Sequence, residues 1–148
     1  PADFDWERIF AGAGWFHFTG ITPALGGNLV EICREACIAA KAKGLTVSCD
    51  LNYRGKLWTR EQARAAMTDL CRYVDVCIGN ESDAADVFGM KLRNTQVVKG
   101  QLDMDEYRKL AEMLMDRFPF RIVAMTLRGS ISASDNDWSA MLYDGEHC

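Results

Sequence analysis

The sequence predicts an α/β domain, a doubly wound and mainly parallel sheet in which helices connect successive strands. Short apolar runs alternate along the chain with amphipathic stretches that open at capping residues. Hydrophobic residues make up 49% of the 148 residues, which is enough for the core of one ordinary domain. Strands separated by helices imply right-handed crossovers, a parallel sheet and helices on both of its faces.

Five strands are expected from runs rich in aromatic and β-branched residues, each bounded by turn-forming residues. The last two are expected to pair as an antiparallel hairpin at one side of the sheet, and Asp144-Gly145 marks a turn after them. In chain order, the predicted strands are 15–18, 45–49, 74–78, 121–126 and 138–143.

The helices between these strands are predicted from their ends. Thr59 and Gln62 have the spacing of a capping box, and Asn80 is expected to cap a short helix. Glycine or proline closes three of the four helices. Counted with these end residues, the predicted helices run from Asn28 to Gly44, from Arg60 to Arg72, from Asn80 to Gly89 and from Asp103 to Pro119, and 90–102 is predicted to be an irregular connection.

Charge and cysteine usage exclude several classes of protein. A net charge of −4 argues against a dedicated nucleic-acid binder, and the apolar runs are far shorter than the roughly 18 residues of a membrane span. The six cysteines form no CxxC pair, and only two histidines accompany them, so a zinc site is not indicated. We therefore expect reduced, buried thiols in a cytoplasmic protein.

Polar residues follow the predicted strands, where open α/β sheets bind their ligands. They are Thr19-Gly20-Ile21, Asp50-x-Asn52-x-Arg54, Asn80 to Asp83, and Thr126 to Ser130. Residues two apart in an extended segment point the same way, so Asp50, Asn52 and Arg54 are expected on one side. The alternative is a polar turn after a strand.

Charged residues among them suggest anion and metal chemistry. Arg54 and Arg128 suit a carboxylate or a phosphate, and the alternative is that they are solvent-facing loop arginines. Asn80 can serve as a helix cap and lie at an anion site at once. Glu81 and Asp83 could hold a hydrated Mg²⁺ near a phosphate, or they could only place favourable charge in a first helical turn.

Four segments together resemble a known enzyme family. They are Phe18-Thr19-Gly20-Ile21-Thr22-Pro23-Ala24-Leu25, Asp50-x-Asn52-Tyr53-Arg54-x-x-Leu57-Trp58, Asn80-Glu81, and Thr126-Leu127-Arg128-Gly129-Ser130. In this order they resemble the ribokinase-like (PfkB-type) carbohydrate kinases, and most of all the 2-keto-3-deoxygluconate kinases. The resemblance implies a doubly wound α/β fold with a small β-lid, and ATP-dependent phosphorylation of a sugar hydroxyl.

The resemblance also implies roles for individual residues. Arg54 would contact the substrate carboxylate near the transferred phosphate, and Gly20 and Ile21 would line the sugar. Asn80 opens a motif that usually reads Asn-x-x-Glu and organises Mg²⁺, whereas its fourth residue here is Asp83, so Glu81 and Asp83 are the metal candidates. The nucleotide would be bordered by Asn52, Arg54, Asn80, Thr126, Arg128, Gly129 and Ser130.

By the same resemblance, residues 1–148 are expected to be the central part of a single ribokinase-like domain. The lid, which could make the protein a homo-oligomer, is expected before Pro1, and the catalytic base in a Gly-Ala-Gly-Asp-type turn after Cys148. The expected partners are a sugar acid and ATP, with neither nucleic acid nor membrane. A fructokinase or ribokinase acting on a neutral sugar, and a non-enzymatic nucleotide-sensing domain, stay open as alternatives.

Overall fold

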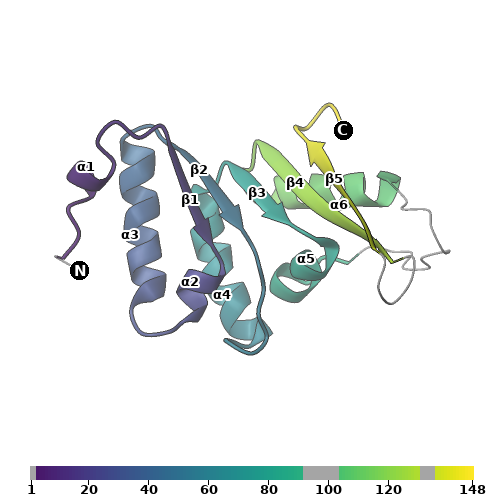
Figure 1. The fold of residues 1–148 in the computed structure, drawn as a ribbon, viewed down its shortest axis with the longest axis horizontal. Coiled ribbons are helices and arrows are strands. Elements are labelled where there is room, and N and C mark those ends of the chain that lie inside the picture. The colour runs from purple at the N-terminus through teal and green to yellow at the C-terminus, as the bar shows by residue number, and fades with distance from the viewer. Residues whose placement is uncertain (1–2, 92–103, 131–135) are drawn as a thin grey trace.

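The computed structural model describes residues 3–91, 104–130 and 136–148 as a five-stranded sheet with helices (Figure 1). The strands lie side by side in sequence order, and the first four are parallel. The last strand pairs antiparallel with the fourth, as predicted. The strands are β1 (Trp15–Thr19), β2 (Thr46–Asp50), β3 (Val76–Gly79), β4 (Ile122–Ser130) and β5 (Asn136–Tyr143).

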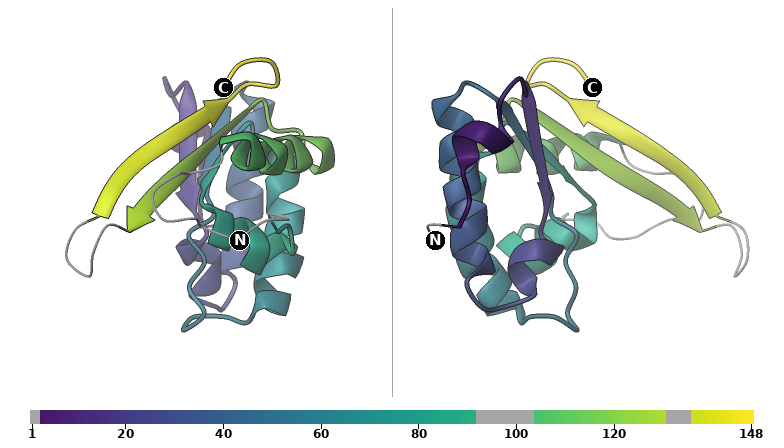
Figure 2. Two further views of the ribbon diagram at one scale, coloured as in Figure 1. Left: turned by 90° about the vertical axis from the view of Figure 1, so that its right-hand side faces the viewer. Right: turned by 60° about the vertical axis from the view of Figure 1, so that its left-hand side comes forward.

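Helices α3, α4 and α6 pack against one face of this sheet (Figures 1 and 2). Right-handed crossovers between strands that lie in sequence order bring each connecting helix to the same side. This explains why these helices share a face, although the sequence led us to expect helices on both faces. The helices are α1 (Trp6–Ile9), α2 (Ile21–Ala24), α3 (Leu29–Ala42), α4 (Arg60–Leu70), η1 (Cys71–Tyr73), α5 (Glu81–Phe88) and α6 (Met104–Arg117).

The core lies between the sheet and these helices. Alternate strand residues point into it, and the central ones are almost fully buried: Val47, Cys49, Cys77, Val123 and Met125. Side chains of the other sheet face are more open, since Trp15 and Leu142 are each 57% exposed. All six cysteines are free thiols, as predicted, and five of them are buried. Among the described residues, no helix has both the length and the apolar character needed to cross a membrane.

Local signals placed most helix ends correctly. Thr59 and Gln62 form the predicted capping box, and Asn80 forms a second one with Asp83 before the helix ends at Gly89, which has a φ of 71°. Asn28 occupies the N-cap of α3, but its side chain makes no capping hydrogen bond there. The predicted start of the fourth helix at Asp103, and 92–102 of the predicted irregular connection, lie outside the described residues.

Several boundaries differ from the sequence prediction: β3 begins at Val76 and not at residue 74, and β5 begins at Asn136 and not at residue 138. β4 does not stop at Thr126 but continues to Ser130, because its later residues keep pairing with β5 through Arg128↔Trp138 and Ser130↔Asn136. The second predicted helix ends its α-helical part at Leu70 and continues as the 3₁₀ turn η1. The short helices α1 and α2 were not predicted.

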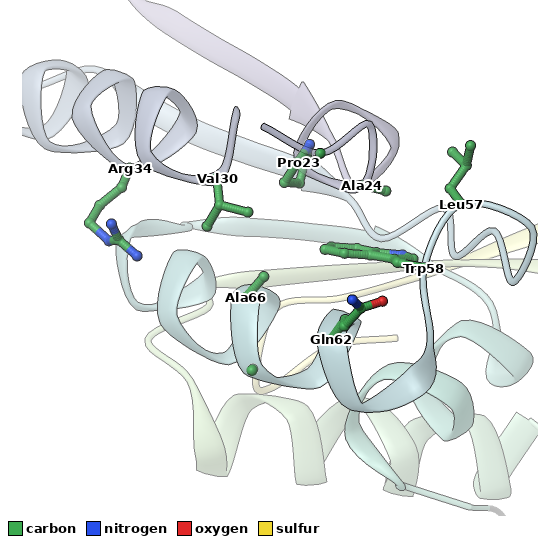
Figure 3. Close-up of a pocket in the computed structure, with 10 residues that line it drawn as sticks. Pro23, Ala24, Val30, Arg34, Leu57, Trp58, Gln62 and Ala66 are labelled. Atoms are coloured by element: carbon green, nitrogen blue, oxygen red, sulfur yellow. The ribbon is translucent and has the colours of Figure 1, made fainter. Parts of the chain in front are cut away.

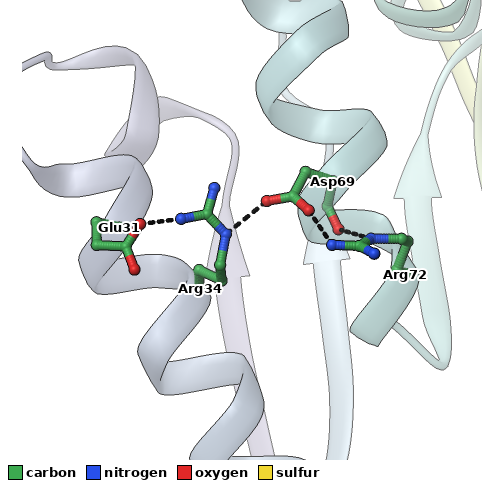
Figure 4. Close-up of polar contacts among 4 residues, drawn as sticks. All are labelled: Glu31, Arg34, Asp69 and Arg72. Carbon is green, nitrogen blue, oxygen red and sulfur yellow. Dashed lines mark hydrogen bonds and ion pairs between the residues drawn. The ribbon is translucent and has the colours of Figure 1, made fainter.

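An ion-pair network fastens α3 to the end of α4 (Figure 4). Arg34 Nε lies 2.6 Å from Asp69 Oδ2, and Arg34 also pairs with Glu31 one turn earlier on α3. Arg72 pairs with the other oxygen of Asp69. Partial burial by itself raises the pKa of Asp69, but the two guanidinium groups outweigh it, so the net pKa is lowered.

Candidate functional site at the carboxyl edge of the sheet

The carboxyl ends of β1 and β2 are in direct backbone contact. Gly20 N–H donates to the Asp50 carbonyl oxygen at 2.8 Å, and a Cβ atom built on Gly20 would lie 2.1 Å from the Leu51 carbonyl oxygen. Only glycine therefore fits at this position with the chain in this arrangement. Ile21, the second residue expected to line the sugar, is the first residue of helix α2. Figure 1 shows this helix directly after β1.

Asn52 connects the same two strand ends through its side chain. Its Nδ2 donates to Thr19 Oγ1 at 3.2 Å, and Thr19 Oγ1 also accepts the Ile21 N–H at 3.3 Å. Asn52 has a φ of 41° and is the one non-glycine residue with a positive φ in the described part of the chain. Left-handed backbone in a non-glycine residue persists only where its surroundings hold it, and it is frequent at functional sites.

Asp83 connects the end of β2 to helix α5. Its Oδ1 accepts the Tyr53 N–H at 3.0 Å, and its Oδ2 accepts the Asn80 N–H at 3.3 Å. The residue is only 8% exposed, and burial raises the pKa of its carboxyl group. Asp50 acts in the same direction on this pKa, whereas the two N–H donors and the positive charge of Arg54 act against it.

Arg54 lies beside this junction with its side chain exposed. Its Nη1 donates to the carbonyl oxygen of Tyr53 at 3.0 Å, which leaves most of the guanidinium donors for another partner. Its charge lies near enough to Asp83 to affect the pKa of that group. The structure therefore brings Arg54, Asp83 and Asn80 together, which are three of the residues predicted for the site.

Glu81 is half-buried at the start of α5 and faces helix α6. Tyr107 of that helix is buried, and its burial together with the nearby carboxylate of Glu81 raises the pKa of the tyrosine. Within the described residues, no group of three or more histidine, cysteine or acidic side chains is arranged to hold a metal ion. Mg²⁺ in phosphoryl-transfer sites commonly takes one or two carboxylates together with water and substrate phosphates. Glu81 and Asp83 are carboxylates of this kind.

The fourth strand contributes Thr126 to the same edge. Its Oγ1 donates to the carbonyl oxygen of Gly79 at 3.4 Å, so it lies beside the turn from β3 into α5. The residues predicted to follow it at the nucleotide belong to β4 itself, where Arg128, Gly129 and Ser130 pair with β5. The side chains of these three residues lie outside the described part of the chain.

A groove of about 530 Å³ opens on the helix side of the sheet, near this edge (Figure 3). Its walls come from α2, α3 and α4 and from the loop that carries Leu57 and Trp58. The predicted site residues of the described chain do not line it. The lining residues are Pro23, Ala24, Gly26, Val30, Arg34, Leu57, Trp58, Gln62, Ala65 and Ala66.

Sequence reasoning missed two contributors to the edge. Tyr53 takes part through its backbone N–H, and its hydroxyl closes the following loop on the Trp58 carbonyl oxygen at 3.3 Å. Tyr107 reaches Glu81 from a helix far along the chain. The spacing Asn80-x-x-Asp83 was available in the sequence as a capping-box signal, but nothing local indicates a partner at Tyr53.

Comparisons with known proteins agree with this arrangement. No family model matches the chain. The 2-dehydro-3-deoxygalactonokinase of Haloferax volcanii is 34% identical over 119 residues, which cover 80% of this chain and 33% of that protein. The crystal structure of 2-dehydro-3-deoxygluconokinase from Thermotoga maritima has a TM-score of 0.88 and 46% identity, over 97% of this chain and 42% of that one.

A third comparison points the same way. A PfkB family carbohydrate kinase from Listeria grayi matches 99% of this chain and 42% of its own, with a TM-score of 0.81 and 30% identity. This chain thus spans between a third and about two fifths of the length of these relatives. By sequence and by α/β fold, as the motifs indicated, this chain is a homologue of the PfkB (ribokinase-like) carbohydrate kinases.

Proposed function

We propose that the protein carrying this chain is an ATP-dependent sugar-acid kinase that phosphorylates 2-keto-3-deoxygluconate on a hydroxyl group. One observation carries the proposal: the 46% identity, over nearly the whole chain, to a kinase described as acting on this sugar acid, which is also called 2-dehydro-3-deoxygluconate. The Haloferax volcanii relative is described as a kinase for the epimeric galactonate, so both named substrates are sugar acids.

Arg54 supplies the physical reason for preferring an acid to a neutral sugar. Its guanidinium is exposed at the carboxyl edge and keeps most of its N–H donors available. A planar guanidinium can donate two parallel hydrogen bonds to a carboxylate, and such charge-assisted bonds are stronger than neutral ones. We assign Arg54 to the substrate carboxylate and to the neighbouring phosphate, with Gly20 and Ile21 beside the sugar.

The nucleotide and its metal ion are assigned to the remaining residues of the edge. Asn52, Arg54 and Asn80 would face the phosphates, with Thr126, Arg128, Gly129 and Ser130 along the nucleotide. Glu81 and Asp83 are the candidate carboxylates of this turn for the hydrated Mg²⁺, an ion that neutralises phosphate charge during transfer. Five buried and unbridged thiols support a reducing, cytoplasmic location for the protein.

The test is a substrate panel with the longest form of the protein that its gene encodes. ADP release would be followed with MgATP and 2-keto-3-deoxygluconate, 2-keto-3-deoxygalactonate, fructose or ribose. We expect kcat/KM for at least one of the two acids to exceed that for either neutral sugar by about 10² or more, since a site built for a charged group discriminates strongly. Preference for a neutral sugar would favour a fructokinase or ribokinase, and nucleotide binding without turnover would favour a sensing domain.

A further inference from the structure

The side chain of Asp83 joins two segments that follow neighbouring strands. One oxygen accepts the N–H of Tyr53, which follows β2, and the other accepts the N–H of Asn80, which follows β3. Its own N–H donates to Asn80 Oδ1 at 2.8 Å, which completes the helix cap. Capping α5 accounts for the contact with Asn80 but not for the contact with Tyr53, thirty residues earlier in the chain.

The contact with Tyr53 acts on the segment that carries Arg54. Asn52 precedes it in a left-handed conformation and is held through its side chain by Thr19. Asp83 then fixes the next peptide group, so the two residues before Arg54 are each tied to another segment, Asn52 to the end of β1 and Tyr53 to helix α5. Arg54 itself is exposed, and its contact is with the adjacent Tyr53 carbonyl oxygen. The direction in which its side chain leaves the edge therefore depends on these two attachments.

We propose that Asp83 is a positioning residue, whose carboxylate holds the segment 52–54 against the start of α5 and so sets the place from which Arg54 reaches its anion. This inference rests on the proposed function, in which Arg54 binds the carboxylate of the sugar. It also gives Glu81 and Asp83, two of the three acidic residues of α5, different roles. Both oxygens of Asp83 already accept backbone N–H groups, which leaves Glu81 as the acidic side chain of this turn for the hydrated metal ion.

The chemistry of the pair explains why a carboxylate is needed here. Two N–H donors approach the two oxygens of one group, so an ionised carboxylate satisfies both. In Asp83→Asn one oxygen would be replaced by an NH₂ group, which cannot accept and would face one of the N–H donors. Asp83→Glu keeps both acceptors but lengthens the side chain by one methylene, so the segment would be displaced and not released.

The experiment compares three variants of the longest form of the protein that its gene encodes. Amide hydrogen exchange at Tyr53 and the ratio of kcat/KM for 2-keto-3-deoxygluconate to that for fructose would be measured in each. In Asp83→Asn we expect exchange at Tyr53 to become about tenfold faster and the ratio to fall about tenfold, because a hydrogen bond to a charged group is lost. Asp83→Glu should give intermediate values if Asp83→Asn fails to fold.

Asp86→Asn is the matched control. Asp86 lies one turn later on α5, where it pairs with the exposed Arg60 at 2.7 Å, and it has no role in the proposed site. This variant should leave both the exchange and the ratio unchanged. Equal effects of the Asp83 and Asp86 substitutions, or faster exchange at Tyr53 with an unchanged ratio, would overturn the proposal. If the unmodified protein does not use sugar acids, the proposed function fails, and the exchange at Tyr53 alone then decides whether Asp83 holds the segment.

Discussion

Gly20→Ala tests the close contact between the ends of β1 and β2. The new methyl group would lie 2.1 Å from the Leu51 carbonyl oxygen and 3.1 Å from the Leu51 carbonyl carbon. A separation below 3.0 Å essentially never occurs for a real Cβ atom, so one segment must move by about 0.9 Å to bring the 2.1 Å contact up to that limit. Neither segment moves freely, because Gly20 N–H donates to Asp50 at 2.8 Å and Leu51 N–H donates to Ile78 at 2.9 Å.

The cost follows from these contacts. Overpacking costs about 1–3 kcal/mol, and each weakened backbone hydrogen bond adds about 1 kcal/mol, so we expect the free energy of unfolding to fall by roughly 2–5 kcal/mol. Urea denaturation followed by circular dichroism would measure this difference. Gly14→Ala is the control, since a Cβ atom there meets nothing within 4 Å, and it should change stability by less than about 1 kcal/mol. Equal stability of the two variants would refute the argument.

Two further predictions concern titratable groups. Burial acts to raise the pKa of Asp75, but Lys41, the Val47 N–H and Arg121 outweigh it and hold this pKa below its ordinary value of 3.8. The ionised carboxylate therefore stabilises the fold above that pH, and this stabilisation is lost as the pH falls through the lower, folded pKa. In an acid titration, Asp75→Asn should lose less free energy of unfolding than the unmodified protein. An equal loss in both proteins would contradict this. Burial raises the pKa of Cys33 to about 11 and that of Cys37 to about 12. At pH 8 a thiol reagent should therefore rapidly label only the exposed Cys148 in the folded chain, and all six cysteines after denaturation. Rapid labelling of a second thiol in the folded chain would count against the buried core.

Signals that depend on neighbouring residues were readable in the sequence. The apolar runs at β1 to β3 are bounded by residues that end strands and are separated by helices, so their approximate places and their parallel direction could be predicted, whereas their order in the sheet was not. The capping residues Thr59 and Asn80 needed only the residues three positions later. Since the carboxyl ends of parallel strands meet at one edge, the region of the candidate site could also be predicted.

Features that depend on distant partners could not be predicted. β4 is longer than its apolar run because β5 continues to pair with it, and pairing leaves no mark in the run itself. The sequence singled out Gly20 through a motif, but not the backbone of Leu51 that makes a side chain impossible there. Asp83 was proposed for the metal from its charge and spacing, whereas its contact with Tyr53 joins residues thirty positions apart.

The most direct test of the proposed sugar-acid site is the substrate preference of Arg54→Gln in the longest form of the protein that its gene encodes. The comparison is kcat/KM for 2-keto-3-deoxygluconate against kcat/KM for fructose, with Arg60→Gln as control, because Arg60 is an exposed arginine of α4 that pairs with Asp86. A hydrogen-bonded guanidinium contributes about 1.5–3 kcal/mol to holding a charged group, so the acid should lose about 10 to 100-fold more than the neutral sugar. Equal losses for both sugars, or an unchanged preference, would contradict the assignment of Arg54 to the substrate carboxylate.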